Sequence, residues 1–159
     1  FSDVHPWARM GGETYGSIFF FKTENISKQI FIKALVTSSP EKAIQDWDRR
    51  RNILKTNTIP VSNWYWFGNG IIIEDYYPNH AIGNVSFNLL LSIGYKLDQL
   101  GFETLKFIDD IRSDSNGNPH YVDFGFDLGE PTKNKKNCAK EYLIREYKDK
   151  MDVINSFYE

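Results

Sequence analysis

The sequence contains one cysteine, Cys138, among 159 residues. One thiol cannot close an internal disulfide, so a small scaffold held together by disulfides is excluded. The few cysteine and histidine residues also lack the spacing of a zinc site. A lone thiol suits a reducing compartment, and we therefore expect a cytoplasmic location.

Long apolar runs and an excess of one charge are missing as well. No apolar run approaches the roughly 20 residues that a membrane-spanning helix needs. The formal net charge is -2, which gives no overall attraction to nucleic acid or to anionic membranes. We therefore expect neither a nucleic-acid partner nor a membrane span.

The residues that are present predict one folded domain with strands and helices. Hydrophobic residues make up 41% of the chain and aromatic residues 16%, which argues against disorder. Residue composition and apolar periodicity predict the elements. Strands are expected at 17–22, 29–36, 64–67 and 71–73, and helices at 40–55, 85–100 and 140–159.

Three short patterns follow one another along the chain. Glycines at 11, 12 and 16 precede a strand that contains Lys33, 17 residues after Gly16. Phe31 and Leu35 flank Lys33 with a period of two, so all three side chains are expected on one face of the strand. A short apolar run at 121–122 then leads into Asp-Phe-Gly at 123–125. Each pattern alone also fits an ordinary strand or turn, but their order is more specific.

Taken in order, residues 8–130 resemble a minimal protein-kinase domain. Among kinases, the chain looks like the very small ones found in bacterial effectors and toxins, or like a reduced aminoglycoside phosphotransferase. The resemblance implies an α+β fold of the two-lobed kinase type, with a small β-rich N-lobe that has one helix and a reduced helical C-lobe. Residues 1–76 would form the N-lobe and hinge, and residues 77–159 the C-lobe. The location would then be cytoplasmic, in the producing cell or in a cell into which the protein is delivered.

The resemblance implies ATP and Mg²⁺ as cofactors and a protein as acceptor. Gly11, Gly12, Tyr15 and Gly16 correspond to the glycine-rich loop over the phosphates, although Glu13 stands where the family has its middle glycine. Lys33 corresponds to the lysine that binds the phosphates.

Two further segments match the family less closely. The expected helix at 40–55 has no glutamate where kinases place the partner of the lysine, so Asp48 or Asp46 is the expected partner. The acidic strand end at Glu74 and the following Tyr76 resemble the hinge that contacts adenine.

The second half supplies the remaining kinase residues. Asp110 would be the catalytic base for the acceptor hydroxyl, and Asp123 of Asp-Phe-Gly would bind Mg²⁺. The interval of 13 residues between them is shorter than is usual in kinases, which leaves Asn116, or Asp114, as the second metal ligand.

Three alternatives remain open at this point. Residues 105–126 also read as a plain hairpin that turns at 116–117 and exposes Asp109 and Asp110. The chain could bind nucleotide or a partner without catalysis, as pseudokinases do. It could also be an unrelated α+β interaction or immunity domain.

Overall fold

The computed structural model describes residues 3–7, 14–22, 27–125, 127–133 and 136–159. The chain forms two compact units. Unit 1 comprises residues 1–49 and 62–77, and unit 2 comprises residues 50–61 and 78–159. The mixture of strands and helices that the sequence predicts is confirmed.

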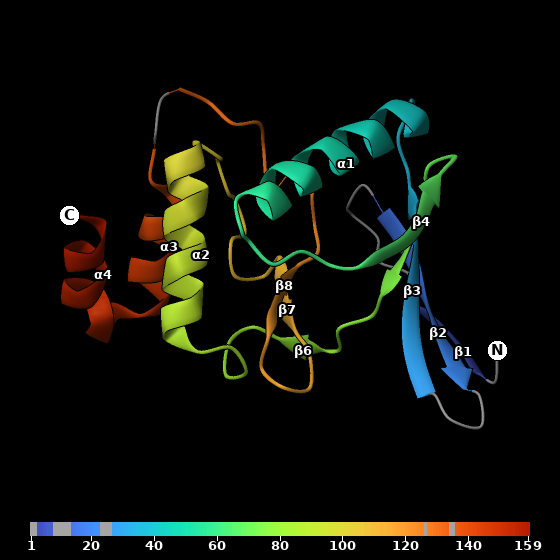
Figure 1. Ribbon diagram of the computed structural model, residues 1–159, viewed down its shortest axis with the longest axis horizontal. Helices are drawn as coiled ribbons and strands as arrows, with labels where there is room; N and C mark the ends of the chain where they lie inside the picture. The colour runs from blue at the N-terminus through green and yellow to red at the C-terminus, as the bar shows by residue number, and fades with distance from the viewer. Residues whose placement is uncertain (1–2, 8–13, 23–26, 126, 134–135) are drawn as a thin grey trace. The chain divides into compact units, whose positions relative to one another are not determined.

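Unit 1 contains an antiparallel sheet with the strand order β1-β2-β3-β5-β4 (Figure 1). Its strands are β1 (Asp3–Trp7), β2 (Thr14–Lys22), β3 (Ser27–Leu35), β4 (Trp64–Gly68) and β5 (Ile71–Asp75). The turn between β4 and β5 follows from its sequence, because Asn69 and Gly70 both have positive φ, 49° and 73°. Asn-Gly is the residue pair that accepts this conformation most readily, and the predicted hairpin is confirmed.

Helix α1 (Pro40–Thr56) begins at Pro40, as the sequence predicts. Proline is tolerated at the first helical position because its missing N–H has no partner within the helix. Three residues of the expected apolar side, Ile44, Trp47 and Leu54, are buried. The boundary between the units falls between Arg49 and Arg50, so both units contain residues of this helix.

Unit 2 contains helix α2 (Phe87–Leu100) and a small sheet with the order β6-β7-β8. The helix starts where the Ser86 side chain accepts a hydrogen bond from Leu89 N, and it ends at Gly101 with φ of 84°. A left-handed glycine is a common helix end, and the predicted end is confirmed. The strands of the small sheet are β6 (Asn79–His80), β7 (Ile111–Ser113) and β8 (Pro119–Tyr121).

The C-terminal segment differs from the prediction of one helix over 140–159. It forms α3 (Cys138–Glu146), the short 3-10 turn η1 (Lys148–Lys150) and α4 (Met151–Tyr158). The buried Asp98 explains the break, because its carboxylate accepts hydrogen bonds from Lys140 N (2.9 Å) and from the Tyr158 hydroxyl (2.7 Å). In one straight helix those two residues would be about 27 Å apart. The chain must therefore turn back after α3.

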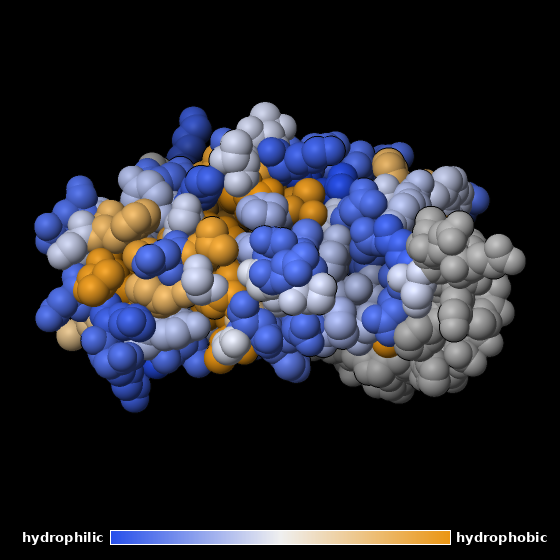
Figure 2. Space-filling view, turned by 60° about the horizontal axis from the view of Figure 1, so that its bottom comes forward, coloured by the Kyte–Doolittle hydropathy of each residue, from blue (hydrophilic) through white to orange (hydrophobic). Residues whose placement is uncertain are grey.

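The expected inner side of that C-terminal helix is only partly buried. Leu143 and Ile154 are buried, whereas Met151 is exposed. Hydrophobic residues reach the surface around the C-terminal helices, where Figure 2 shows orange hydrophobic patches between blue hydrophilic ones. The exposed hydrophobic residues of α4 include Val153 and Phe157. Among the residues that the structure describes, no helix is both long and apolar enough to cross a membrane.

Candidate functional site

Lys33 lies in the middle of β3 with its side chain on the buried face of the sheet of unit 1. Phe31, Lys33 and Leu35 are all buried, as their period of two predicts. On the neighbouring strand, Glu74 stands opposite Phe31 and Ile72 stands opposite Lys33, so Glu74 shares the face of Lys33. The register of β3 against β5 thus brings an acid diagonally beside the lysine.

Lys33 and Glu74 form a buried ion pair, with Nζ and Oε1 2.6 Å apart. Aromatic rings line the ammonium group, since Nζ lies 5.4 Å from the ring centre of Trp47 and 5.6 Å from that of Phe31. These are distances at which a ring face attracts a cation. Within the described part of the chain, Glu74 Oε2 is buried and has no hydrogen-bond partner. The ion pair therefore holds the Lys33 side chain in place, and the second carboxylate oxygen of Glu74, Oε2, could accept a further hydrogen bond.

The two helix acids named as expected partners of Lys33 lie on α1. Asp46 contacts Arg49 of the same helix, with Oδ1 and Nη2 3.4 Å apart, and Asp48 is half-buried. The ion pair through Glu74 was missed by sequence reasoning. It depends on the pairing of strands that are about 40 residues apart in the chain, which no local pattern reveals. A role for Asp46 or Asp48 stays a prediction.

Three further residues predicted to bind nucleotide, Tyr15, Gly16 and Tyr76, lie in or near the same sheet. Gly16 is in β2, and a Cβ placed there would lie 2.0 Å from Cζ of Phe31. Packing of the Phe31 ring therefore requires glycine at this position. Tyr15 is in β2, and Tyr76 follows β5, donates its N–H to Gln29 O and packs against Phe31. Gly11 and Gly12 lie outside the described residues.

In unit 2, the hairpin of β7 and β8 brings Asp110 and Asp123 together. Ile111 pairs with Tyr121, and the ladder continues through Val122 N, which donates to Asp110 O at 2.9 Å. Asp110 directly precedes β7 and Asp123 follows β8 by two residues, so both stand at the open end of the hairpin. The hairpin alternative for residues 105–126 holds only for β7 and β8, because residues 105–110 form turns instead of a strand. It is also wrong about exposure, because Asp110 is buried and Asp109 is exposed.

Asp123 is held by its own turn and by the packing of the next residue. Its Oδ1 accepts a hydrogen bond from Gly125 N at 2.9 Å. The Phe124 ring is fully buried and packs against Tyr121 with ring centres 5.8 Å apart. Arg50 donates from Nη1 to Phe124 O at 2.8 Å and pairs with Glu130. Side-chain packing and hydrogen bonds thus hold Asp-Phe-Gly in place within unit 2.

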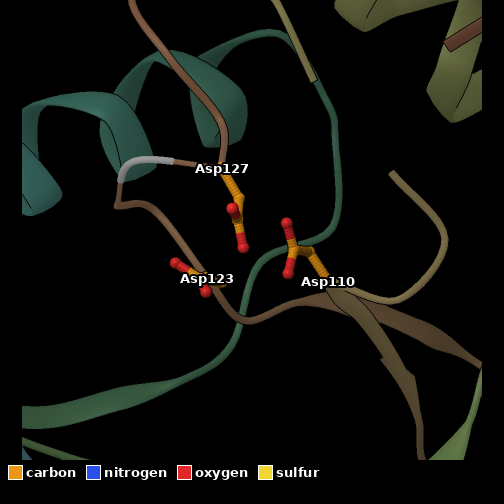
Figure 3. A group of neighbouring side chains, drawn as sticks. All are labelled: Asp110, Asp123 and Asp127. Carbon is orange, nitrogen blue, oxygen red and sulfur yellow. The ribbon is translucent and has the colours of Figure 1, made fainter. Parts of the chain in front are cut away.

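A third carboxylate, that of Asp127, joins the first two. One carboxylate oxygen from each of Asp110, Asp123 and Asp127 lies within 4.8 Å of the others. Figure 3 shows the carboxylates of Asp110 and Asp127 turned toward each other, with Asp123 beside them. Sequence reasoning missed Asp127, although its position four residues after Asp123 in a glycine-containing turn was a usable signal.

Asp110 is the most buried member of this group, with 5% of its surface exposed. Burial raises the pKa of Asp110 to about 9, and the negative charges of Asp123 and Asp127 add to the effect. Its Oδ2 atom is buried and has no hydrogen-bond partner among the described residues. Three neighbouring carboxylates, one of which has a buried oxygen without a partner among the described residues, suit a hard divalent cation such as Mg²⁺, which prefers oxygen ligands. The residues present therefore fit the metal that the sequence predicts.

Asn116, the other predicted metal ligand, is not brought to this cluster. It lies in the turn at the opposite end of the hairpin. Three residue pairs of β7 and β8 separate that turn from Asp110 and Val122, and they span about 10 Å along the strands. There Asp114 organises the turn, since its carboxylate accepts hydrogen bonds from Asn116 N, Asn118 N and the His120 ring. In the described structure Asp114 and Asn116 therefore stabilise the turn of the hairpin through their hydrogen bond.

Comparison with known proteins finds a similar solved structure but no similar sequence. No family model matches the sequence, and no curated protein matches it. Among solved structures, the chain is similar to the crystal structure of the Rio2 kinase-ADP/Mg²⁺-phosphoaspartate complex from Chaetomium thermophilum. The TM-score is 0.54 and the identity 16%, over 94% of this chain and 61% of that one. This likeness shows a protein-kinase-like fold, and the chain spans about 61% of the length of its neighbour.

Proposed function

We propose that this chain is an ATP- and Mg²⁺-dependent phosphotransferase that acts on a hydroxyl group of a protein. One observation carries the proposal. In a chain with a kinase-like fold, a hairpin places the carboxylates of Asp110 and Asp123 within 4.8 Å of each other. The similar Rio2 kinase structure is a complex with ADP and Mg²⁺, which supports the choice of cofactors.

In this proposal Lys33 binds phosphate oxygens of ATP through its ammonium group. Glu74 fixes the position of that group through the 2.6 Å ion pair. The backbone around Gly11, Gly12 and Gly16 approaches the phosphates, and the segment from Glu74 to Tyr76 contacts the base.

In the proposed reaction Asp123 would hold Mg²⁺, and Asp110 receives the proton of the acceptor hydroxyl. The hydroxyl oxygen forms a bond to the γ-phosphorus while the bond from that phosphorus to the bridging oxygen of ADP breaks. Mg²⁺, when bound, would offset the negative charge that develops on the phosphate oxygens. The products are the phosphorylated hydroxyl, ADP, which keeps the former bridging oxygen, and Asp110, which holds the proton.

A second candidate is nucleotide binding without turnover. The observation that favours it is the burial of Asp110 beside two other carboxylates, which raises its pKa to about 9. A carboxyl group that is protonated at neutral pH cannot accept another proton. Catalysis by Asp110 therefore requires a bound cation to stabilise its ionised form.

Phosphate transfer from γ-labelled ATP to proteins of a lysate separates the two candidates. The phosphotransferase transfers label in the presence of Mg²⁺, whereas the binding protein shows a thermal shift with ATP and Mg²⁺ but no labelled product. Asp123→Asn should abolish transfer and leave the fold intact. Asp110→Asn should lower single-turnover transfer by roughly 10²- to 10⁴-fold with ATP affinity almost unchanged. Asp109→Asn, which changes an exposed neighbour, is the control, and equal effects of the last two variants would contradict the role of Asp110.

Calorimetry tests the role of Lys33. Lys33→Ala should weaken ATP binding by about 1.5–3 kcal/mol, the usual contribution of a charge-assisted hydrogen bond. Lys28→Ala is the matched control, because Lys28 lies on the same strand and its side chain is 43% exposed, against 9% for Lys33. Tryptophan fluorescence must show that the variant is folded. Equal ATP affinity of the Lys33 variant and the parent would remove Lys33 from the site.

A further inference from the structure

The cluster around Asp110 contains one carboxylate more than the proposed reaction uses. Backbone hydrogen bonds hold the extra residue, Asp127, in its place. Its carbonyl oxygen accepts from Leu105 N at 2.8 Å, and the next residue, Leu128, donates its N–H to Gly125 O at 3.1 Å. The Leu128 side chain is fully buried. The segment that carries Asp127 is therefore anchored on both sides, and the acid is held close to Asp123.

Three carboxylates held together in this way repel one another when all are ionised. A second, independent observation indicates what offsets the repulsion. Asp110 is more than nine-tenths buried, and its Oδ2 has no hydrogen-bond partner among the described residues. Its carboxylate is turned toward that of Asp127 (Figure 3). Arg50, which lies nearby in the same unit, directs its guanidinium group to Glu130 and to Phe124 O.

The spacing of the oxygens suits a hard cation. Ligands around octahedral Mg²⁺ are separated by about 3 to 4.2 Å, and those around Ca²⁺ by up to about 4.8 Å. The three carboxylate oxygens lie within 4.8 Å of one another, which falls within the range for Ca²⁺ and close to that for Mg²⁺. Mg²⁺ at phosphotransfer sites is commonly held by one or two carboxylates together with the phosphates of the nucleotide. Three carboxylates would supply enough protein ligands to hold the ion without those phosphates.

We propose that Asp127 is a direct ligand of a divalent cation bound by Asp110, Asp123 and Asp127, and that this site binds its cation before any nucleotide is present. Asp127 then supplies the additional ligand that sequence reasoning assigned to Asn116. The inference rests on the proposed function for the use of the cation in phosphate transfer, but the binding of the ion rests on the cluster and on the buried Oδ2 of Asp110.

The experiment measures Mn²⁺ binding to the full chain without nucleotide, with free Mn²⁺ read by electron paramagnetic resonance. The parent protein should bind Mn²⁺, and added Mg²⁺ should displace it. Asp127→Asn keeps the side-chain shape and removes one repulsive charge, so the variant should fold. It should bind Mn²⁺ at least about tenfold more weakly, since even changes to the outer shell of a metal site cost 10- to 100-fold. Asp109→Asn removes an exposed charge close by and should change the affinity less than about twofold.

Three results would overturn the inference. They are unchanged Mn²⁺ affinity of the Asp127 variant, equal weakening by the Asp127 and Asp109 variants, and no binding by the parent protein without nucleotide. If that last result came with clear binding of ATP and Mg²⁺ together, the proposed function would stand and this inference would fail. If Mn²⁺ bound as expected but ATP did not bind at all, the inference would stand and the proposed function would fail.

Discussion

Removing one partner of the buried pair of Lys33 and Glu74 should strongly destabilise unit 1. The two side chains are 9% and 2% exposed and their charged atoms are 2.6 Å apart. At an effective dielectric constant near 20, two unit charges at that distance attract by about 6 kcal/mol, and desolvation offsets part of this. Glu74→Leu leaves the lysine charge buried without this partner, so we expect a loss of about 3–5 kcal/mol in the free energy of unfolding.

Replacing the other partner of the pair, Lys33→Met, should lower the free energy of unfolding by a similar amount, because it leaves the Glu74 carboxylate buried without the lysine. The double variant should be far more stable than the sum of the two losses implies. Replacing a buried ion pair by apolar residues of similar volume is often close to neutral. A coupling free energy of at least about 3 kcal/mol between the two sites is therefore expected.

Urea denaturation followed by tryptophan fluorescence suits this measurement. The four tryptophans, at positions 7, 47, 64 and 66, all belong to unit 1. The pair of Lys28 and Asp75 is the internal control, since it lies in the same unit at 3.0 Å but its side chains are 43% and 18% exposed. Breaking that pair should cost no more than about 1 kcal/mol. Additive losses in the double variant, or a loss at Glu74 as small as that at Lys28, would refute the account of a buried, coupled pair.

Two further predictions concern the packing of unit 1 and the turn of unit 2. Gly16→Ala should cost about 1–3 kcal/mol in urea denaturation, because the new Cβ would lie 2.0 Å from the Phe31 ring, and the added change Phe31→Leu should recover part of the loss. Burial alone would raise the pKa of Asp114, but hydrogen bonds from Asn118, His120 and Asn116 outweigh it and lower the pKa to about 2. The stability that ionised Asp114 contributes is therefore complete above about pH 4 and lost as the pH falls through 2. The melting temperatures of the parent and of Asp114→Asn, followed by circular dichroism, should differ at pH 6 and converge toward pH 2, and a constant difference would contradict this reasoning.

Several elements could be predicted because their signals are local. Asn69 and Gly70 adopt positive φ, which asparagine and glycine tolerate best, and the hairpin around them follows. Pro40 starts α1 and Gly101 ends α2 for equally local reasons of φ and hydrogen bonding. The burial of Lys33 follows from the period of two along β3, since its neighbours on that face are apolar.

The candidate site could be predicted only in part. The order of motifs along the chain predicts Lys33, Asp110 and Asp123 as site residues. In the structure Lys33 and Asp110 are buried, and a turn holds the Asp123 carboxylate. Sequence patterns do not reveal the partner of Lys33 or the third carboxylate, since they assign Glu74 to a hinge and Asp127 to a polar segment.

Local sequence patterns predict many of the helices and strands of this protein, and the order of its charged residues is given by the sequence directly. Turn residues, helix ends and apolar periods act over a few residues, so they can be recognised without a fold. Which charged residues meet depends on the tertiary structure. Glu74 reaches Lys33 through the register of β3 against β5, and Asp127 reaches Asp110 through a turn anchored by the buried Leu128. The C-terminal helix breaks because Asp98 binds both of its ends, a contact between residues up to 60 positions apart. Such contacts depend on the packing of the whole unit, and no short stretch of sequence encodes them.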